Sequence, residues 1–578
     1  MTVAALRFDS AGGRSFQLAG LKEEFAARRP EEVPAVLDRV EAAAADGLHA
    51  AGFVTYEAAT AFERAFRVHD PDARLPLCWF GAFRERLETG PPTPGGGYEL
   101  GEWRATLGKE AYRERVERIR DLIAAGDSYQ VNLTFPLHAG FSGDPAALYA
   151  DLARAQRAGY AALLDFGEVA VVSLSPELFF HLRGRDLKLK PMKGTRPRGR
   201  WREEDQLLAA DLAGTPKERA ENLMIVDMLR NDAGRLAVPG SVRVPRLYEV
   251  ESYPTVYQMT STVEARTRPG TRLRDVFAAL FPCGSVTGAP KVRTVEIIRE
   301  LEDTPRGVYT GAVGFVSGGE AVFNVAIRTL LVERSPGTAQ MGVGSGIVHE
   351  SDPVAEYQEC LQKAAFTRVP GADFELLETL LWEPEDGFYL LARHLRRMAW
   401  SAERFCFPFD RDRALRALEG ACADKREPLK VRLTLDRSGR FRARTLPLAE
   451  SREPLRVTIC DQPVEEGPLL YHKTTYRSPY ESRAARHPGA DEVILVNDRG
   501  QLTESTTANL VLRIDGECLT PPLSCGLLPG VMRAELLARG EVRERVLIPE
   551  DLRRAEEFWL VNSVTGRRRA RLQGEAPG

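Results

Sequence analysis

The sequence predicts a mixed α/β (α+β) protein of two successive domains, and three observations lead to that prediction. Its 578 residues exceed what one ordinary hydrophobic core supports. Short apolar strands and amphipathic helices follow one another along the chain. Near "TRVPGADF", residues 367–374, one series of elements ends and another begins. We therefore expect a domain over residues 1–365, a linker over 366–373 and a second domain over 374–578.

The overall composition is that of an ordinary globular protein without a strong charge. Hydrophobic residues make up 43%, charged residues 28%, and the formal net charge is −3, so no global field favours nucleic acid or a membrane surface. No apolar run reaches the about 18 residues of a membrane span, and "MTVAALRFDSAGG" does not have the pattern of a secretory signal. The eight cysteines show no C-x-x-C spacing, which argues against a disulfide framework or a structural zinc site. We expect a cytoplasmic protein that binds neither nucleic acid nor membrane.

The elements of the first domain can be followed in order. "EAYRERVERIRDLIAAG" predicts a helix that stops at Gly126, and strands follow in "SYQVNLTFPL", "AALLDFGEVAVVSLSPELFFHL" and "DLKLKPM". "PKERAENLMIVDMLRNDAGRLA" predicts a helix that ends near Gly234, and "VTGAPKVRTVEIIRELED" predicts one entered through Gly288 and Pro290. Two strands, "GVYTGAVGFVS" and "AVFNVAIRTLLVE", a glycine-rich turn in "MGVGSGIV" and a helix in "DPVAEYQECLQKAAF" complete the domain.

Two acidic pairs stand out in the first domain. Glu218 and Glu221 lie three residues apart in one predicted helix, and Glu356 and Glu359 repeat that spacing in another, so each pair faces one side of its helix. If the pairs converge, a cation must neutralise them, and Mg²⁺ suits oxygen ligands combined with an anionic substrate. An isolated E-x-x-E is more often a solvated helix face.

Other positions in this domain are candidate anion receptors or nucleophiles. Arg328 lies on an otherwise apolar strand, where a substrate carboxylate would be a bidentate partner; Tyr309 on the preceding strand offers a hydroxyl to the same group. The turn in "GVGSGI", 342–347, offers backbone N–H groups, although hairpin glycines are more often only turns. Lys193, in "LKLKPMKGTRPRG", is either a solvated charge or a nucleophile at a strand end.

Six motifs make the first domain resemble the chorismate-utilising enzymes, such as anthranilate synthase component I and aminodeoxychorismate synthase component I. In order they are "PMKGTRPRG", "AENLMIVDMLRND", "FPCGSVTGAPKVR", "RGVYTGAVGF", "FNVAIRT" and "GSGIV…AEYQE". The resemblance implies two packed antiparallel sheets flanked by helices, with Mg²⁺ held by Glu221 and Glu359 and with Glu218 and Glu356 close by. It also implies chorismate as substrate, bound by Thr195, Tyr309, Arg328, Gly344, Ser345, Gly346 and Gln130.

Position 193 separates members of that family. Anthranilate synthases typically read P-I-A-G-T here, whereas "PMKGT" resembles the P-I-K-G-T of aminodeoxychorismate synthases. In that mechanism the lysine amine adds to C2 of chorismate and expels the 4-hydroxyl, ammonia enters at C4, and the lysine leaves. The site must then lower the pKa of Lys193. Gln130 stands where isochorismate synthases carry a lysine that activates water, and Gln258 replaces a histidine of many relatives, which leaves an acid–base role there open.

The second domain pairs a lysine with a distant glutamate. It begins with predicted strands "FELLETLLW" and "FYLLARH" and the helix "LRRMAWSAERF". Lys473 precedes Thr-Thr-Tyr, and Glu504 follows the strand "EVILVN" and the turn "DRGQ". A Schiff-base lysine with an acidic partner for a pyridinium nitrogen suits pyridoxal 5'-phosphate (PLP). Arg397 and the helix start in "GLLPGVMRAELL" suit its phosphate. Lys473 alone would more often be a surface lysine.

In combination, the motifs of residues 373–575 resemble the class IV PLP enzymes. These include D-amino-acid and branched-chain aminotransferases and aminodeoxychorismate lyase. The resemblance implies two α/β subdomains with PLP between them and usually a homodimer. It implies a Schiff base on Lys473 and contact of Glu504 with the ring nitrogen. Arg397, Val531 and Met532 are the implied phosphate ligands, Thr507 is a further cofactor-binding candidate, and Thr506 and Asn509 are neighbours.

The two resemblances together imply synthesis of 4-aminobenzoate in two steps, amination of chorismate and then elimination of pyruvate. Motifs alone do not separate a lyase from an aminotransferase in the second domain, but the fusion favours a lyase that uses the first domain's product. Two alternatives stay open: anthranilate synthase fused to an aminotransferase, and a fusion with one catalytically silent binding half. The sequence has no recognisable glutamine amidotransferase motif, so we expect ammonia from a separate amidotransferase subunit or from solution.

Overall fold

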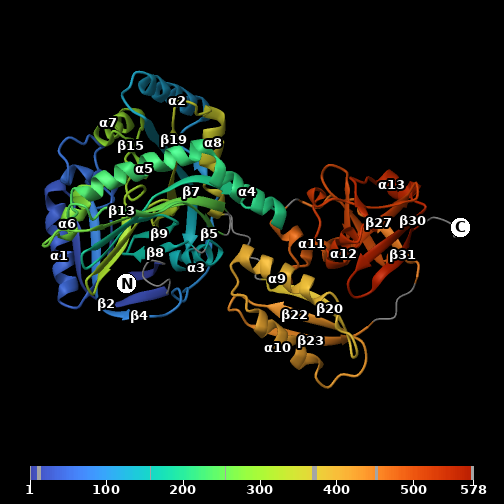
Figure 1. The fold of residues 1–578 in the computed structure, drawn as a ribbon. Coiled ribbons are helices and arrows are strands. Elements are labelled where there is room, and N and C mark those ends of the chain that lie inside the picture. The colour runs from blue at the N-terminus through green and yellow to red at the C-terminus, as the bar shows by residue number, and fades with distance from the viewer. Residues whose placement is uncertain are drawn as a thin grey trace. The chain divides into compact units, whose positions relative to one another are not determined.

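The computed structural model divides the chain into two compact units. It describes residues 2–8, 15–156, 158–253, 256–367, 374–448, 453–465 and 467–573. One unit comprises residues 1–198 and 208–370, and the other comprises 199–207 and 371–578 (Figure 1). One division falls at residue 370, inside the expected linker, of which residues 368–373 lie outside the described part. Residues 199–207, expected in the first domain, group with the second unit.

The first unit is built on one long series of antiparallel strands. Its first half runs, neighbour by neighbour, through β7 (Gln130–Gly143), β19 (Thr338–Ile347), β18 (Thr329–Glu333), β9 (Val169–Ser175), β8 (Tyr160–Asp165), β1 (Val3–Phe8) and β2 (Ser15–Ala27). The series continues from β2 to β4 (Cys78–Leu87), β3 (His49–Val54), β16 (Ala312–Ser317), β17 (Glu320–Val325), β10 (Leu178–Arg183), β11 (Asp186–Lys190) and β14 (Val256–Arg266). Finally, β12 (Met192–Pro197) and β13 (Arg243–Ser252) both pair with β14. Three short strands, β5 (Tyr98–Leu100), β6 (Arg104–Ala105) and β15 (Gly288–Ala289), pair with β7.

The two halves of this series pack face to face as two sheets. Phe8, Phe16 and Phe315 meet between them edge to face, with ring centroids 5.1 and 5.5 Å apart, a favourable arrangement of buried aromatic rings. One outer face packs against α1 (Val33–Ala45), α5 (Pro216–Gly234) and α6 (Leu273–Leu280). The other packs against α2 (Lys109–Ala124), α3 (Pro145–Gln156), α7 (Lys291–Leu301) and α8 (Pro353–Gln362). The prediction of two packed antiparallel sheets flanked by helices is confirmed.

Three local predictions in this unit were wrong, all at strands. "AVFNVAIRTLLVE" is not one strand: it breaks between β17 and β18, where Arg328 takes a φ of +47°, a left-handed conformation that cannot continue a strand. Tyr309 lies in a turn before β16 rather than on the strand. The glycine-rich stretch 342–347 is not a turn but the second half of β19, in continuous register with β7.

The second unit contains two sheets that correspond to the two expected α/β subdomains. The smaller has the order β21 (Gly387–Phe388), β20 (Leu376–Glu383), β22 (Leu429–Leu435) and β23 (Phe441–Pro447), and packs on α9 (Leu391–Phe405) and α10 (Arg411–Cys422). The larger has the order β26 (Leu502–Ser505), β25 (Glu492–Val496), β24 (Leu455–Ile459), β31 (Gly566–Leu572), β30 (Glu557–Asn562), β27 (Asn509–Ile514), β28 (Glu517–Thr520) and β29 (Arg543–Glu544). Helices α11 (Ser478–Ala485), α12 (Val531–Ala538) and α13 (Pro549–Arg554) accompany it.

The expected strand "FYLLARH" was wrong beyond its first residue. The strand β21 ends at Phe388, Leu390 adopts a left-handed φ of +51°, and α9 starts at Leu391. Because His394, Leu395 and Met398 all lie on the buried side of α9, the apolar run is the first turn of an amphipathic helix.

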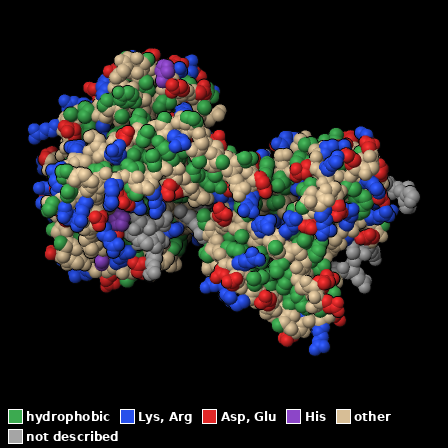
Figure 2. Space-filling view, in the orientation of Figure 1, with side chains coloured by type: hydrophobic (Ala, Val, Ile, Leu, Met, Phe, Trp, Pro, Cys, Tyr) green, Lys and Arg blue, Asp and Glu red, His purple; other side chains and the backbone are tan. Residues whose placement is uncertain are grey.

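Surface and helix properties agree with the composition. Acidic and basic side chains alternate over the visible surface of both units without a large region of one sign (Figure 2). Across the described ranges, no helix combines the length and apolarity that a bilayer crossing requires.

Candidate functional sites

One cavity in the first unit collects almost all the site residues that the sequence predicted there. Its lining includes Lys193, Thr195, Glu218, Glu221, Tyr309, Arg328, Gly344, Ser345, Gly346, Glu356 and Glu359. These residues come from β12, α5, α8, β19 and the turns that flank β16 and β18. Gln130, the remaining predicted substrate ligand, is buried directly behind Gly346, where a β-carbon would lie 2.2 Å from its amide nitrogen.

Lys193 is placed by an irregularity in β12. The pairing of β12 with β14 shifts register between Met192 and Thr195, and Gly194 supplies a φ of +85° there, which a glycine adopts without strain. The Lys193 ammonium has no hydrogen-bond or ion-pair partner within the described chain. Burial lowers its pKa, an effect that Glu221 and Glu177 partly oppose. A lysine in this position is closer to the neutral, nucleophilic amine than a solvated lysine is.

Arg328 enters the same cavity as a cation without a partner. Its guanidinium makes no hydrogen bond or ion pair to any described residue, and burial lowers its pKa. A half-buried guanidinium without a carboxylate is unfavourable by itself, as is the left-handed backbone of this residue. Both features favour a role in binding an anion that arrives in the cavity.

Four carboxylates form one wall of the cavity. Glu218 accepts a hydrogen bond from Arg196 at 2.9 Å, Glu359 pairs with Lys363 at 2.8 Å, and Glu356 accepts from Ser345 and, at 2.8 Å, from Ser351. Glu221 has no such partner in the described chain.

Burial raises the pKa of Glu221, and its acidic neighbours Glu218 and Glu356 act in the same direction. A hard divalent cation would relieve this repulsion, so the donor set fits Mg²⁺. The two E-x-x-E pairs that the sequence placed on separate helices do converge.

The glycines of β19 leave a bare strand edge along the cavity. The carbonyl of Gly344 accepts a hydrogen bond from Lys363 Nζ at 2.8 Å and therefore points away from β7. Since N–H and C=O of one residue in a strand point to the same edge, the N–H groups of Gly342, Gly344 and Gly346 face that edge too.

Side chains would not fit at these positions. A β-carbon at Gly342 would lie 2.1 Å from the Tyr309 ring, and one at Gly344 would lie 2.6 Å from the Thr134 methyl. The glycines thus serve close packing and an open edge, rather than the predicted turn.

Glu177 is a functional candidate that the sequence analysis missed. It lies between β9 and β10, lines the cavity, and is 3% exposed. One of its carboxylate oxygens has no hydrogen-bond partner in the described chain. Burial raises its pKa to about 7, against the opposing effects of Ser285 and Lys193. The available signal was "SLSPELFF", an acid between two apolar strands.

The predicted residues of the second unit form a separate group. Lys473 follows a short 3₁₀ turn, and its carbonyl accepts a hydrogen bond from the backbone N–H of Leu377 at 2.9 Å. Its pKa is lowered to about 8 by burial and by the cations Arg397 and Arg477, which outweigh the acids Glu378 and Glu504. An amine with this pKa is suited to a Schiff base and to proton transfer near neutral pH.

Arg397 lies against the start of α12. Its NH1 donates to the carbonyl of Pro529 at 3.0 Å, directly before the helix that begins at Val531 with Met532 second. Its Nε and NH2 bind the buried Glu378 at 2.8 and 2.7 Å, and His394 binds that same carboxylate at 2.6 Å. The guanidinium and the helix N-terminus therefore converge, as a phosphate requires.

Glu504 is held in the pattern expected for a partner of a ring nitrogen. One oxygen accepts from Tyr480 Oη at 3.0 Å and from the N–H of Leu528 at 3.1 Å, and the other accepts from Asn509 at 3.2 Å. Burial raises its pKa to about 7, and a bound pyridinium would favour its charged form. The residues Lys473, Glu504 and Arg397 thus fit PLP.

Thr507 is placed less favourably for a cofactor. Its hydroxyl donates to Glu492, which also accepts from the hydroxyl of Thr506 at 2.6 Å, and Thr507 is exposed. Glu492 therefore organises this turn, and the cofactor contact of Thr507 stays a prediction.

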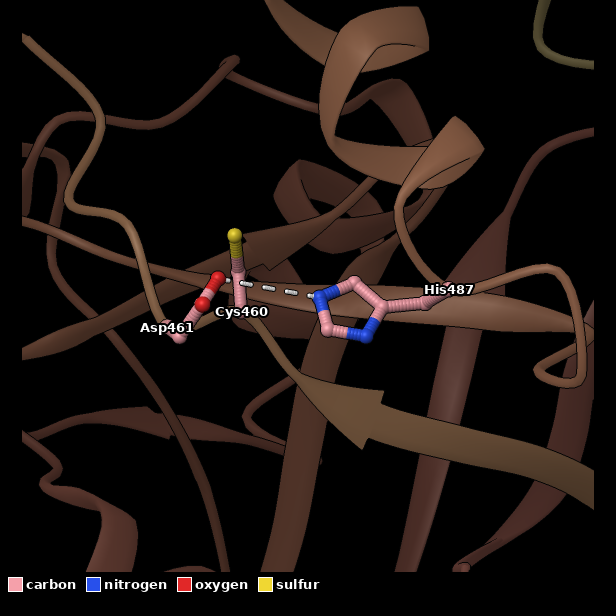
Figure 3. A group of neighbouring side chains, drawn as sticks. All are labelled: Cys460, Asp461 and His487. Atoms are coloured by element: carbon pink, nitrogen blue, oxygen red, sulfur yellow. Dashed lines mark ion pairs between the residues drawn. The ribbon is translucent and has the colours of Figure 1, made fainter.

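A third group of potential ligand atoms lies in the second unit, at Cys460, Asp461 and His487 (Figure 3). Their sulfur, oxygen and nitrogen atoms are within 4.8 Å of one another. The His487 Nε2 to Asp461 Oδ1 distance is 3.9 Å, and Arg486 approaches the same carboxylate at 3.5 Å. Because Asp461 is mostly exposed and already shared with a guanidinium, we interpret the group as a surface ion pair.

Comparisons with known proteins agree with this division. Residues 5–368 match the family of chorismate binding enzymes, and residues 375–572 match the family of class IV amino-transferases. The chain is 44% identical over 300 residues to an aminodeoxychorismate synthase component 1 of Klebsiella aerogenes, covering 52% of this chain and 64% of that protein. It is also 44% identical over 256 residues to an anthranilate synthase component 1 of Haloarcula marismortui, covering 44% and 52%.

A solved structure resembles the first unit. Anthranilate synthase component I from Streptococcus pneumoniae TIGR4 superimposes with a TM-score of 0.52 at 27% identity, over 63% of this chain and 90% of that chain. The matched part spans less than two thirds of each curated relative described above.

Proposed function

Because this chain belongs to the family of chorismate binding enzymes and carries a class IV amino-transferase domain, we propose that it makes 4-aminobenzoate from chorismate in two steps. The first unit replaces the 4-hydroxyl of chorismate by an amino group. The second unit removes pyruvate from the resulting 4-amino-4-deoxychorismate. The observation that carries the proposal is Lys193, an amine of lowered pKa in the same cavity as the acidic wall and Arg328, whose guanidinium has no partner among the described residues.

In the first step Lys193 is the nucleophile. Its neutral amine forms a bond to C2 of chorismate, both ring double bonds shift by one position toward C4, and the C4–O bond breaks. Ammonia then bonds to C4, both double bonds shift back, and the C2–N bond to Lys193 breaks. The net exchange is ammonia for water.

Other groups of the cavity bind the substrate and move protons. Arg328 and the free N–H groups of β19 hold substrate carboxylate, and Tyr309 supports the ring. Mg²⁺ bound by the acidic wall would neutralise that wall and a substrate carboxylate. Glu177, with a pKa of about 7, is half protonated near neutral pH and serves to protonate the departing hydroxyl.

Gln130 favours ammonia over water as the entering group. Its side chain is buried behind Gly346, where a β-carbon would meet both its amide nitrogen and Lys193 Nζ, and its Oε1 is buried without a described donor. An amide cannot take a proton from water, but it can accept a hydrogen bond from ammonia.

In the second unit Lys473 moves the proton. PLP, when bound, supplies an electron sink for the substrate amine. Lys473 takes the proton from C4, the electron pair forms the C3=C4 bond, and the C3–O bond to the pyruvate-derived group breaks. Glu504 would hold the ring nitrogen, and Arg397, which lies at the α12 N-terminus, would hold the phosphate.

An anthranilate synthase joined to an aminotransferase is the second candidate, because the Haloarcula relative is as similar in identity as the Klebsiella one. Lys193 counts against it. A form with one silent binding half is disfavoured because each unit retains a complete set of reactive groups.

The test is product identification with the purified chain. We expect 4-aminobenzoate and pyruvate from chorismate, Mg²⁺ and ammonium only when PLP is present. Lys193→Ala should stop chorismate consumption, and Lys473→Ala should let 4-amino-4-deoxychorismate accumulate. Lys188→Ala, on β11 and outside the cavity, should do neither. Formation of 2-aminobenzoate would contradict the proposal.

Supply and assembly complete the proposal. Ammonia comes from a separate glutamine amidotransferase subunit. The purified chain should therefore consume chorismate with ammonium as the nitrogen source and should not do so with glutamine. The second unit forms a homodimer, which sedimentation measurements would test.

A further inference from the structure

Arg477 is fixed beside the candidate PLP site by contacts on two sides. It lies four residues after Lys473 and caps the start of α11. Its NH2 donates to the backbone carbonyl of Thr506, and its guanidinium stacks 4.5 Å from the centre of the Tyr480 ring. Since Tyr480 donates to Glu504, the guanidinium is connected to the residue assigned to the ring nitrogen.

Three buried carboxylates around this site are engaged by other groups. Glu378 binds Arg397 and His394, Glu504 binds Tyr480 and Asn509, and Glu492 binds two threonines. In the described part of the chain, Arg477 forms no ion pair, and its Nε and NH1 donate no hydrogen bond.

Arg477 is thus a cation with free donors near a second cation. It and Arg397 both disfavour the charged form of Lys473. Such a concentration of positive charge is stable when a ligand brings the missing negative charge. The planar fork of the guanidinium matches a carboxylate.

We propose that Arg477 binds a carboxylate of the amine substrate. This contact would make the second unit selective for cyclic amines whose carboxylate lies opposite the amino group on the substrate ring. This inference rests on the proposed function of the second unit as a PLP site. It adds a recognition element that neither the ring-nitrogen partner nor the phosphate ligands supply, because those groups bind the cofactor alone.

The test compares two ligands that differ only in charge. 4-Aminobenzoate carries the carboxylate, and 4-aminobenzamide replaces it with a neutral group of similar shape. Both are added to the PLP-loaded full chain, and their binding is measured as protection of the PLP chromophore against hydroxylamine. This readout follows the second unit alone and requires no turnover. The variants are Arg477→Gln, Arg477→Lys and, as a matched control on α11, Arg483→Gln, whose guanidinium hydrogen bonds to described residues all go to backbone carbonyls.

We expect the natural chain and Arg483→Gln to bind the carboxylate about ten- to hundred-fold more tightly than the amide, as for a charge-assisted bond. Arg477→Gln should lose that preference while it keeps its affinity for the amide, and Arg477→Lys should keep part of it. The inference is overturned if the natural chain shows no preference. It is also overturned if Arg477→Gln weakens both ligands equally or changes the PLP spectrum before ligand is added, since Arg477 would then hold the cofactor. A retained preference without pyruvate release would instead refute only the proposed reaction.

Discussion

Lys193 and Gly346 approach each other closely enough that even a β-carbon at position 346 would make a tight contact with the lysine ammonium. A β-carbon there would lie 3.2 Å from Lys193 Nζ and 2.2 Å from the Gln130 amide nitrogen. The strand that presents its bare edge to the cavity therefore also sets the position of the proposed nucleophile.

Substitution at this contact should impair chemistry more than folding. Gly346→Ala forces Gln130 and Lys193 to move, and a misplacement of about 1 Å reduces rates by about hundred-fold. We expect a fall of that size in chorismate consumption, with a thermal unfolding midpoint close to that of the natural chain. Gly140→Ala, on the neighbouring strand β7 with no atom within 4 Å of the added carbon, is the control. Equal losses in both variants would count against a special role for Gly346.

The amine of Lys193 should react as a weaker base than an ordinary lysine. Its pKa is lowered by burial from 10.5, so its neutral form appears at lower pH. Competitive acetylation across a pH series, read by mass spectrometry, should give a half-reaction point for Lys193 below 10.5 in the folded chain. The denatured chain provides the reference, since Lys193 is solvated there. An identical point in both states would remove the basis for nucleophilic attack at neutral pH.

Glu177 should impose an acid requirement on the first step. Its pKa is raised to about 7, so the carboxyl is protonated below that pH and loses its proton as the pH rises through it. Chorismate consumption at saturating ammonia should then fall above about pH 7. Glu177→Gln should lower the rate about hundred-fold and abolish this limb of the profile.

The exposed Glu168→Gln provides the control for that profile. If Glu177→Gln still shows the fall in rate above about pH 7, that fall belongs to the titration of another group.

Glu378 should stabilise the folded state of the second unit and keep Arg397 in position at the proposed cofactor site. Its pKa is lowered to about 2, because Arg397 and His394 outweigh the effect of burial. The stability that it contributes is therefore present above pH 4.5 and is lost as the pH falls from 4.5 toward 2. Glu378→Gln leaves Arg397 without its charge partner, which costs about 3–5 kcal/mol in comparable buried pairs.

The measurements for Glu378 are urea unfolding and retention of PLP on gel filtration. Glu378→Gln should unfold at lower urea concentration and release PLP faster, whereas Glu375→Gln, which removes a more exposed ion pair with Arg442, should do neither. An unchanged rate of PLP release in Glu378→Gln would show that Glu378 does not support the proposed phosphate site.

Much of this architecture was readable from the sequence, for reasons that are local. Strong periodicity predicted α2, α5 and α7 close to their observed bounds, because an amphipathic helix repeats its pattern over many residues. The pairs Glu218–Glu221 and Glu356–Glu359 could be placed on helix faces for the same reason. That both faces meet in one cavity came only through the family resemblance, since tertiary convergence leaves no periodic signal.

The wrong predictions share a physical cause. Arg328, Tyr309 and the glycines of β19 were interpreted by composition, but their backbone is determined by what packs against them. A glycine required by a neighbouring tyrosine ring looks, in sequence, like a glycine required by a turn. Glu177 was missed because a buried acid with a raised pKa resembles any loop acid until its surroundings are known.

The left-handed backbone of Arg328 has a consequence for how this protein can change. Glycine would adopt the φ of +47° without strain, and it would also remove a cation that has no partner in the described chain. Arg328→Gly is therefore a substitution that should make the folded chain more stable while it removes the proposed carboxylate receptor. If Arg328 has that role, stability and activity oppose each other at this position. A search for stabilised variants that screens on unfolding temperature alone would then select against the arginine on which the proposed reaction depends.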